Sequence, residues 1–535
     1  MRIRGDILRT YQSIHTWTGI ISGLVLFIGF YAGSLTMFKT EIEYWATPPS
    51  MHLSSIPIEK FDRLIVQATS TFDKAQHGFT LNFNQKLSPM TWYQQGGGRS
   101  IHLDSTINHA TLSADGELMT QLSPTNELGE LIDMLHRTAG IAGKVGHEDI
   151  GVLILGIAAV LYFLALVSGV IFLLPTLVKS FFALRTNKGV NRFWLDSHNL
   201  VGIISLPFHL IIAWTVVVFA FHDIFYGGLS IIYGDKPLFE PSKKSAIEYH
   251  VKQLPPISSY IKQVNELTDG YKIDALKFSG LSSVRPMVAI SIINPKEMMR
   301  SNTGDIIYMN PYTFSVQYNS ASADKNDNYT PIVVSFFSLH FGSYGGNLGR
   351  WLYFVMGLLG AFIFYSGNLL WLEKRRKKQP EQSKSNRFMA SLTIGICLGS
   401  ILGVVSTMLS SKWLYLANMP FNKSFIICYY TVFFTALLYS FTRGAARAAI
   451  HLQQLVALAC LAIPMTSLLA KLIPNLALWN SSSSSDLIID MTAFIFSGVF
   501  FYSAQKTRQR AYEGESNSIW TLPFERIEVT AEPNL

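Results

Sequence analysis

The 535-residue sequence has few charged residues and few cysteines. Only 15% of its residues are charged whereas 49% are hydrophobic, so the chain is far too apolar for an ordinary water-soluble domain. Cys397, Cys428 and Cys460 all lie inside apolar stretches and show no CxxC spacing. This absence excludes covalent haem attachment through CxxCH and a cysteine zinc site, and it predicts no disulfide. The composition predicts a polytopic α-helical membrane protein.

Nucleotide-binding loops are also absent. Gly96-Gly97-Gly98 and Gly345-Gly346 are rich in glycine, but neither follows a strand and opens a helix in a βαβ unit, as a phosphate-binding loop does. We therefore expect no flavin or nicotinamide cofactor. The net charge of +8 forms no basic stripe or tail, because the positive residues lie between apolar stretches. We expect contact with membrane lipids and none with nucleic acid.

Apolar stretches of membrane length recur along the chain. A transmembrane helix needs roughly 20 apolar residues. Eight candidate stretches lie at about 16–38, 150–175, 199–226, 350–373, 389–410, 424–441, 449–473 and 487–504. The first is too long for the core of a signal peptide and is followed by no small-residue cleavage site, so we interpret it as a retained signal anchor. The sequence thus predicts about eight transmembrane helices.

Basic residues gather in alternate loops. They follow the second, fourth, sixth and eighth apolar stretches, which predicts that those loops and both termini are cytoplasmic. The two long segments on the other side contain alternating, strand-like stretches such as MVAISI and predict two small α+β domains. The predicted organisation is an N-terminal segment with the first helix at 1–38, an outer domain at 39–149, two helices at 150–226, a second outer domain at 227–349, the fourth helix with a basic loop at 350–378, a C-terminal four-helix block at 379–505 and a cytoplasmic tail at 506–535.

Two internal repeats relate the halves of the first two-thirds of the chain. The stretch from His198 (HNLVGIIS) repeats the stretch from His15 (HTWTGIIS), each at the start of an apolar stretch. A looser pair matches MLHR at His136 with SLHF at His340, and a Ser-Gly pair follows each one downstream. The chain therefore resembles a duplicated unit of helix, outer segment and helix, with one histidine at the same place in each of four helices.

The four repeated histidines fall into two layers on this topology. His15 and His198 lie at the cytoplasmic ends of the first and third helices, and His136 and His340 lie on the outer side, ahead of the second and fourth. Two neutral imidazoles that face each other across a helical bundle are the ligands that a b-type haem requires, so the layers predict two haems. Two alternatives stay open. The histidines are interfacial anchors, or they line a metal-transport path, although the helix interiors contain almost none of the carboxylates that such a path usually adds.

His209 lies 11 residues after His198 in the same apolar stretch. On a continuous helix this spacing places both rings on one face, about 20° and about 16 Å apart, whereas His222 faces another direction. His209 is therefore a candidate ligand or a group between the cofactors. Alternatively, because it follows Pro207, it hydrogen-bonds a carbonyl that a kink has freed. The arginines interpreted either as partners of haem propionates or as snorkelling interfacial residues are Arg137, Arg192 and Arg350.

These motifs resemble those of a known family. At His15-x-x-x-Gly19, Leu135-His136-Arg137, His198-x-x-x-Gly202 and Leu339-His340-Phe341-Gly342, over about 8–378, the sequence is similar to the PepSY-associated transmembrane family, which includes iron-regulated inner-membrane proteins and ferric-siderophore reductases of Gram-negative bacteria. The resemblance implies PepSY-like periplasmic domains, two b haems between the four core helices and reduction of a ferric siderophore on the periplasmic face. Two features depart from the family's pattern, namely the polar segment His147-Glu148-Asp149 and the additional four-helix block.

With this resemblance, the sequence predicts a multi-pass oxidoreductase of the bacterial inner membrane with both termini in the cytoplasm. We expect a ferric-siderophore reductase that passes electrons from a haem at His15 and His198 to a haem at His136 and His340, and that releases Fe(II). The electron donor stays open between a quinol and a cytoplasmic reductase, and no catalytic residue is assigned. The alternative is a non-enzymatic PepSY-type membrane protein that binds a peptide or a metal complex, or a component of metal transport.

Overall fold

The structure, a computed structural model, describes residues 4–98, 101–146, 148–178, 183–185, 189–234, 249–301, 303–321, 329–376, 382–480, 483–515 and 517–522. Within these ranges, eight helices are long and apolar enough to cross a membrane, which confirms the predicted number. They are α1 (Gly5–Thr36), α6 (Ile150–Leu173), α9 (Leu206–Tyr233), α12 (Gly346–Arg376), α13 (Lys384–Leu416), α14 (Phe421–Arg443), α15 (Ala445–Leu472) and α16 (Ser484–Glu513).

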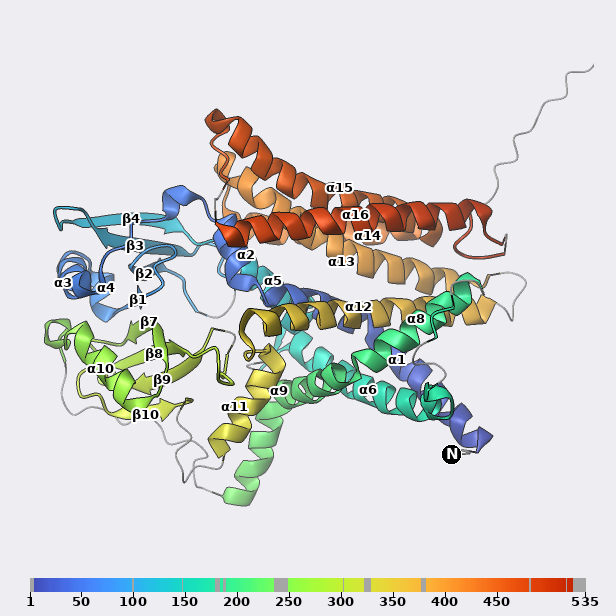
Figure 1. The fold of residues 1–535 in the computed structure, drawn as a ribbon, viewed down its shortest axis with the longest axis horizontal. Coiled ribbons are helices and arrows are strands. Elements are labelled where there is room, and N and C mark those ends of the chain that lie inside the picture. Colours follow the sequence, from blue (N-terminus) through green and yellow to red (C-terminus); the bar gives the residue numbers. More distant parts are fainter. Residues whose placement is uncertain are drawn as a thin grey trace, which may run out of the picture.

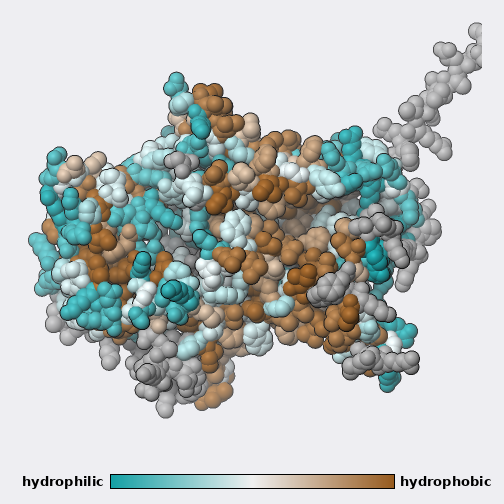
Figure 2. All heavy atoms as spheres, in the orientation of Figure 1, coloured by the Kyte–Doolittle hydropathy of each residue, from teal (hydrophilic) through white to brown (hydrophobic). Residues whose placement is uncertain are grey.

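The long helices form one bundle with a β-sheet at one end (Figure 1). We call the end of the bundle that carries the sheet the sheet side and the opposite end the far side. α1 begins and α16 ends on the far side. Hydrophobic side chains gather over the helices and hydrophilic ones gather over the sheet (Figure 2), as expected for a bundle in lipid with a domain in water.

The sheet combines both long segments that the sequence places outside the membrane. Its antiparallel order is β10-β9-β8-β7-β1-β2-β3-β4. The first segment supplies β1 (Gly78–Asn82), β2 (Met90–Gln95), β3 (Thr106–Leu112) and β4 (Leu118–Pro124), and the second supplies β7 (Lys272–Ser279), β8 (Met287–Ile293), β9 (Asp305–Met309) and β10 (Val316–Asn319). Each segment adds helices, α3 (Phe61–Thr71) and α4 (Asp73–His77) from the first and α10 (Ile257–Leu267) from the second.

The two α+β units therefore share one sheet, which the sequence did not predict. β1 pairs with β7, and Phe79 lies opposite Phe278 with the ring centroids 4.8 Å apart. An edge strand presents unpaired backbone N–H and C=O groups, and here each unit covers such an edge of the other. One hydrophobic core runs through both units.

The third predicted span is broken, and the prediction of a continuous helix through His198 and His209 is wrong. α8 (Val190–Ile204) ends at Ser205, and α9 starts directly after it. Pro207 lies in the first turn of α9, where its missing N–H costs no helical hydrogen bond. The azimuth of about 20° worked out for an unbroken helix does not apply to these two histidines.

Two short helices precede α6 and α12. They are α5 (Leu128–Thr138), which carries His136, and α11 (Tyr329–Phe341), which carries His340. These two histidines thus lie ahead of the second and fourth spans, as predicted, but on helices of their own. The remaining elements are α2 (Lys39–Ala46), the ribbon β5 (Lys144–Val145) and β6 (Glu148–Asp149), and the 3-10 turns η1 (Pro49–Met51), η2 (Ile58–Lys60), η3 (Leu174–Thr176), η5 (Val251–Gln253) and η6 (Pro474–Leu476).

α1 is the central helix of the bundle. It packs against α6 on one side and α12 on the other, and α6 also packs against α9. The C-terminal block, α13 to α16, lies beside α1 and α12. The repeated histidines therefore all belong to the first bundle, and the block covers its outer face.

Candidate functional site

The four repeated histidines meet in two pairs. On the far side, the rings of His15 (α1) and His198 (α8) have centroids 6.3 Å apart. On the sheet side, those of His136 (α5) and His340 (α11) have centroids 6.1 Å apart. Each pair takes one histidine from each copy of the repeat. The sequence predicted this pairing, and the structure brings these four residues together accordingly.

The far-side pair and the sheet-side pair are separated along α1. His136 hydrogen-bonds the carbonyl oxygen of Gly29, which lies 14 residues after His15 on the same helix. At 1.5 Å per residue this spacing corresponds to about 21 Å between the layers. A span of hydrocarbon is about 30 Å thick, so the two pairs lie toward opposite faces of the membrane.

Nδ1 of every one of the four rings has a hydrogen-bond partner. His15 donates to the carbonyl oxygen of Ala165 at 2.8 Å, and His136 donates to that of Gly29 at 2.8 Å. The partner of each ring belongs to the same copy of the repeat as the ring itself. His198 contacts Oγ of Ser366 at 2.9 Å, and His340 contacts Oγ1 of Thr215 at 2.9 Å. Within the described residues, no hydrogen bond involves Nε2 of any of the four.

These partners fix the tautomer of the rings. A carbonyl oxygen only accepts, so Nδ1 of His15 and of His136 carries the proton. The hydroxyl of Ser366 donates to the carbonyl oxygen of Ile363 at 3.2 Å, and that of Thr215 donates to the carbonyl oxygen of Ile211 at 2.9 Å. Each hydroxyl has one proton, so it accepts from the histidine. In this arrangement Nδ1 of all four rings carries a proton, and Nε2 is the nitrogen that is available to a metal ion.

The Ser-Gly pairs of the repeat lie against the far-side histidines. A β-carbon on Gly169 would lie 2.8 Å from Nδ1 of His15, and one on Gly367 would lie 3.4 Å from Cε1 of His198. On the sheet side, a β-carbon on Gly33 would lie 2.6 Å from Nδ1 of His136. The rings therefore sit against bare backbone, which holds their orientation.

This geometry suits a bis-histidine metal centre. Two imidazoles that bind one metal ion from opposite sides, with bonds of about 2 Å and about 1.1 Å from nitrogen to ring centre, have centroids about 6 Å apart. Both observed separations agree with this value. Metal-binding histidines usually donate their other ring N–H to a carbonyl or a similar acceptor, as all four rings do here. The residues present therefore fit the axial ligation of b-type haem.

His209 lies between the pairs and is completely buried. Its ring packs against those of Phe30 at 5.5 Å, Tyr162 at 6.0 Å and Phe208 at 5.2 Å. Neither ring nitrogen has a hydrogen-bond partner within the described residues. The interpretation in which it bonds a carbonyl freed by Pro207 is therefore wrong, and the interpretation as a group between the cofactors stays a prediction.

The three arginines considered for haem propionates all have carboxylate partners in the protein. Arg137 bonds Asp133 at 2.8 Å, Arg350 bonds Glu41 at 2.8 Å, and Arg192 lies 3.2 Å from Asp196. Two of these residues have a further partner, because Arg350 also donates to the carbonyl oxygen of Met37 and Asp196 also pairs with Arg185. These arginines stabilise the ends of the bundle.

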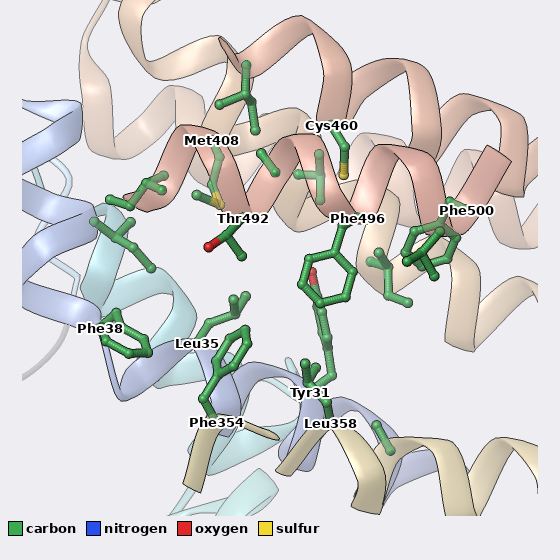
Figure 3. A pocket seen from close by; sticks show the side chains of 18 of the residues that line it. Tyr31, Leu35, Phe38, Phe354, Leu358, Met408, Cys460, Thr492, Phe496 and Phe500 are labelled. Carbon is green, nitrogen blue, oxygen red and sulfur yellow. The ribbon is translucent and has the colours of Figure 1, made fainter. Parts of the chain in front are cut away.

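A cavity of about 520 Å³ separates the first bundle from the C-terminal block. Its walls come from α1, α2, α12, α13, α15 and α16, and Figure 3 shows side chains such as Tyr31, Phe354 and Phe496 around it. The walls are mainly apolar, and polar groups such as Gln453 and Thr492 are scattered among them. No sequence pattern predicted this cavity, because its residues come from six different helices.

The C-terminal block also buries a lysine that the sequence analysis missed. Lys412 is 1% exposed. Its Nζ donates to Oγ of Ser467 at 3.1 Å and to the carbonyl oxygen of Trp479 at 3.3 Å, and it lies 4.5 Å from the ring centre of Trp45. Asp486, also buried, has two carboxylate oxygens without a hydrogen-bond partner within the described residues. The available signal was an ionisable side chain directly beside an apolar stretch, because Lys412 follows the stretch at 389–410 and Asp486 precedes the one at 487–504.

The histidines of the sheet domain take no part in the two pairs. His109 on β3 is buried and contacts Oγ of Ser88 at 2.9 Å and of Ser123 at 3.1 Å. Burial, with a smaller contribution from His52, lowers the pKa of His109 to about 4. His109 is thus a neutral packing residue at physiological pH.

Comparison with known proteins adds one finding. The model of a family described as the PepSY-associated TM region matches residues 12–374, which include all four paired histidines and both segments that build the sheet. The C-terminal block lies outside the match. No curated protein matches the chain.

Proposed function

We propose that this chain, which belongs to the PepSY-associated transmembrane family, is a di-haem b oxidoreductase of the bacterial inner membrane that reduces Fe(III) in a siderophore on the periplasmic side. One observation carries the proposal. Two pairs of histidines, about 21 Å apart along α1, each have the ring-centroid separation that two imidazoles holding one haem iron would need, and Nδ1 of each ring is already hydrogen-bonded within the protein.

The residues of the chain would hold two haems and set their environment. When bound, the haems supply one-electron carriers on the two sides of the membrane. His15 and His198 would hold one, and His136 and His340 the other. The Nδ1 hydrogen bonds raise the basicity of each imidazole and keep its ring in place. The aromatic cluster around His209 fills the space between the pairs and excludes water from it.

The proposed substrate follows from coordination chemistry. Siderophores offer hard oxygen ligands, which hold Fe(III) far better than Fe(II), so one electron loosens the metal without breaking the chelator. Such a reaction needs no nucleophile and no proton-transfer group, and we assign no catalytic residue. The sheet domain, which extends from the side of His136 and His340, would receive the complex.

The orientation rests on charge. Seven basic residues lie from Lys374 to Arg387, between the last turn of α12 and the first turn of α13 on the far side, and the positive-inside rule predicts that they are cytoplasmic. Some of them lie outside the described residues. A reporter that works only in the cytoplasm should be active when fused after residue 378, and one that works only in the periplasm should be active near Ser301. The reverse pattern would invert the roles of the two pairs.

The cavity favours a quinol over a cytoplasmic reductase as the electron donor. It has a volume in the usual range for small-molecule sites and opens among helices that cross the membrane, where quinols dissolve. Tyr365 lines it from α12, directly before Ser366, whose hydroxyl contacts His198. One helix, about 10 Å across, therefore separates the cavity from the far-side pair, which the proposed path reduces first.

A visible absorption spectrum of the purified chain tests the proposal. We expect a Soret band, sharp α bands after reduction, and two haems per chain that acid acetone extracts, because no cysteine motif holds them covalently. A colourless protein would instead support the alternative, a non-enzymatic membrane protein that binds a peptide or a metal complex or takes part in metal transport. One haem per fully loaded chain would leave one pair without its proposed role.

A further inference from the structure

A third group of potential ligands lies on the sheet side, apart from the four paired histidines. Glu148, His222 and Asp223 each offer one ligand atom, and these atoms all lie within 4.8 Å of one another. Glu148 comes from β6, in the polar segment that departs from the family's pattern, and the other two come from α9. The proposed electron path uses none of the three.

The histidine of this group is oriented as a metal ligand. Nδ1 of His222 donates to the carbonyl oxygen of Phe219 at 2.7 Å, which fixes the proton there and leaves a lone pair on Nε2. Nε2 lies 3.2 Å from a carboxylate oxygen of Asp223. With Glu148, one imidazole nitrogen and two carboxylates thus converge on one point, where a bound cation would balance the two negative charges.

We propose that Glu148, His222 and Asp223 bind a first-row divalent metal ion. One imidazole and two carboxylates suit Mn(II), Fe(II), Co(II) or Zn(II), whereas Mg(II) and Ca(II) prefer oxygen ligands alone. The two carboxylates balance the charge of the ion. The side chains of His222 and Asp223 are 45% and 60% exposed, so an ion reaches them without any opening of the bundle.

The position of the site indicates its occupant. Phe219, whose carbonyl oxygen holds His222, packs its ring 5.0 Å from that of His340 in the sheet-side pair. The site therefore adjoins the place where the proposed reduction would release Fe(II). The assignment of ferrous iron as the occupant rests on the proposed function, whereas the metal site itself rests on the three side chains.

Calorimetric titration of the purified full-length chain with Co(II) tests the site. We expect one ion per chain at this site, and at least a tenfold loss of affinity in His222→Asn and in Glu148→Gln. His77→Asn is the matched control, because His77 also faces a carboxylate, that of Asp73 at 3.8 Å, but has no third ligand. Co(II) binding that is absent in the unmodified chain, or unchanged in both site variants, would overturn the proposal.

Two further measurements separate this proposal from the proposed function. The haem spectrum of each variant should equal that of the unmodified chain, which also shows that the bundle has folded. A chain that binds Co(II) through His222 but contains no haem would refute the proposed function alone, and a haem-loaded chain without Co(II) binding would refute the metal site alone. Anaerobic titration of the metal-free chain with Fe(II) should also show one ion bound at this site, with a loss of affinity in His222→Asn, and no Fe(II) binding in the unmodified chain would refute ferrous iron as the occupant.

Discussion

Thr215 offers the most direct perturbation of the sheet-side pair. It is buried, and its hydroxyl accepts from Nδ1 of His340 at 2.9 Å. Thr215→Val keeps the shape of the side chain and removes the acceptor. A hydrogen-bond acceptor on Nδ1 makes the imidazole a stronger electron donor to the iron and favours ferric iron. Loss of this acceptor should therefore raise the reduction potential of the sheet-side haem. Loss of one hydrogen bond of about 1 kcal/mol corresponds to about 40 mV for a one-electron couple.

A potentiometric titration followed by visible absorption measures this shift. Ser366→Ala is the matched variant for the far side, because Ser366 accepts from His198 at 2.9 Å. In a His15→Ala background, where only the sheet-side haem should remain, Thr215→Val should still raise the potential and Ser366→Ala should not. If both variants shift the same haem, or if Thr215→Val shifts neither, the assignment of the two pairs is wrong.

Three more predictions address other parts of the chain. His340→Ala should leave only the far-side haem, which the donor reduces but which cannot pass electrons to a periplasmic ferric complex. His15→Ala should leave only the sheet-side haem, which an external reductant reduces but the donor does not. Loss of the same haem in both variants would refute the pairing. The free energy of unfolding of the sheet domain should fall by up to about 3 kcal/mol as the pH drops from 6.5 to about 4, because His109 binds a proton in the unfolded chain that burial excludes in the folded domain. Thermal unfolding should therefore depend less on pH in His109→Gln than in the control variant His77→Gln. Cys460→Trp should fill the cavity and slow haem reduction by a soluble quinol analogue but not by dithionite, and Cys428→Trp, outside the cavity, should have no such effect.

The histidine pairs were predictable because the repeat preserves their positions. Two copies of one unit place equivalent residues at equivalent depths, and basic loops indicate which depth is which. Their Nδ1 partners were only partly predictable. Ser366 belongs to the repeated Ser-Gly pair, but the carbonyl oxygens of Ala165 and Gly29 carry no sequence signal, since every residue has one.

The sheet shows a second limit of sequence patterns. Alternating stretches predict strands and therefore two α+β units, but they do not state which edges pair. The pairing of β1 with β7 joins residues almost two hundred positions apart, such as Phe79 and Phe278. The buried environment of Lys412 is similar in kind, because its partners, Ser467 and Trp479, lie on other elements and form no motif in sequence. Contacts between distant segments depend on tertiary packing, which one sequence does not display.

The break at Ser205 explains why the predicted rotation of about 20° between His198 and His209 is wrong, although the four repeated histidines lie in the predicted pairs. On one straight helix, His198 and the residues after Pro207 would keep a fixed rotation relative to one another. The break allows α8 to turn His198 toward Ser366 on α12, while α9 separately presents Thr215 to His340. Each end of the span thus meets its own neighbour. A proline two residues beyond the end of the repeated motif was the local signal. The first copy has no proline at that place, and its continuous helix α1 carries both His15 and Gly29, the partner of His136, to the same two layers.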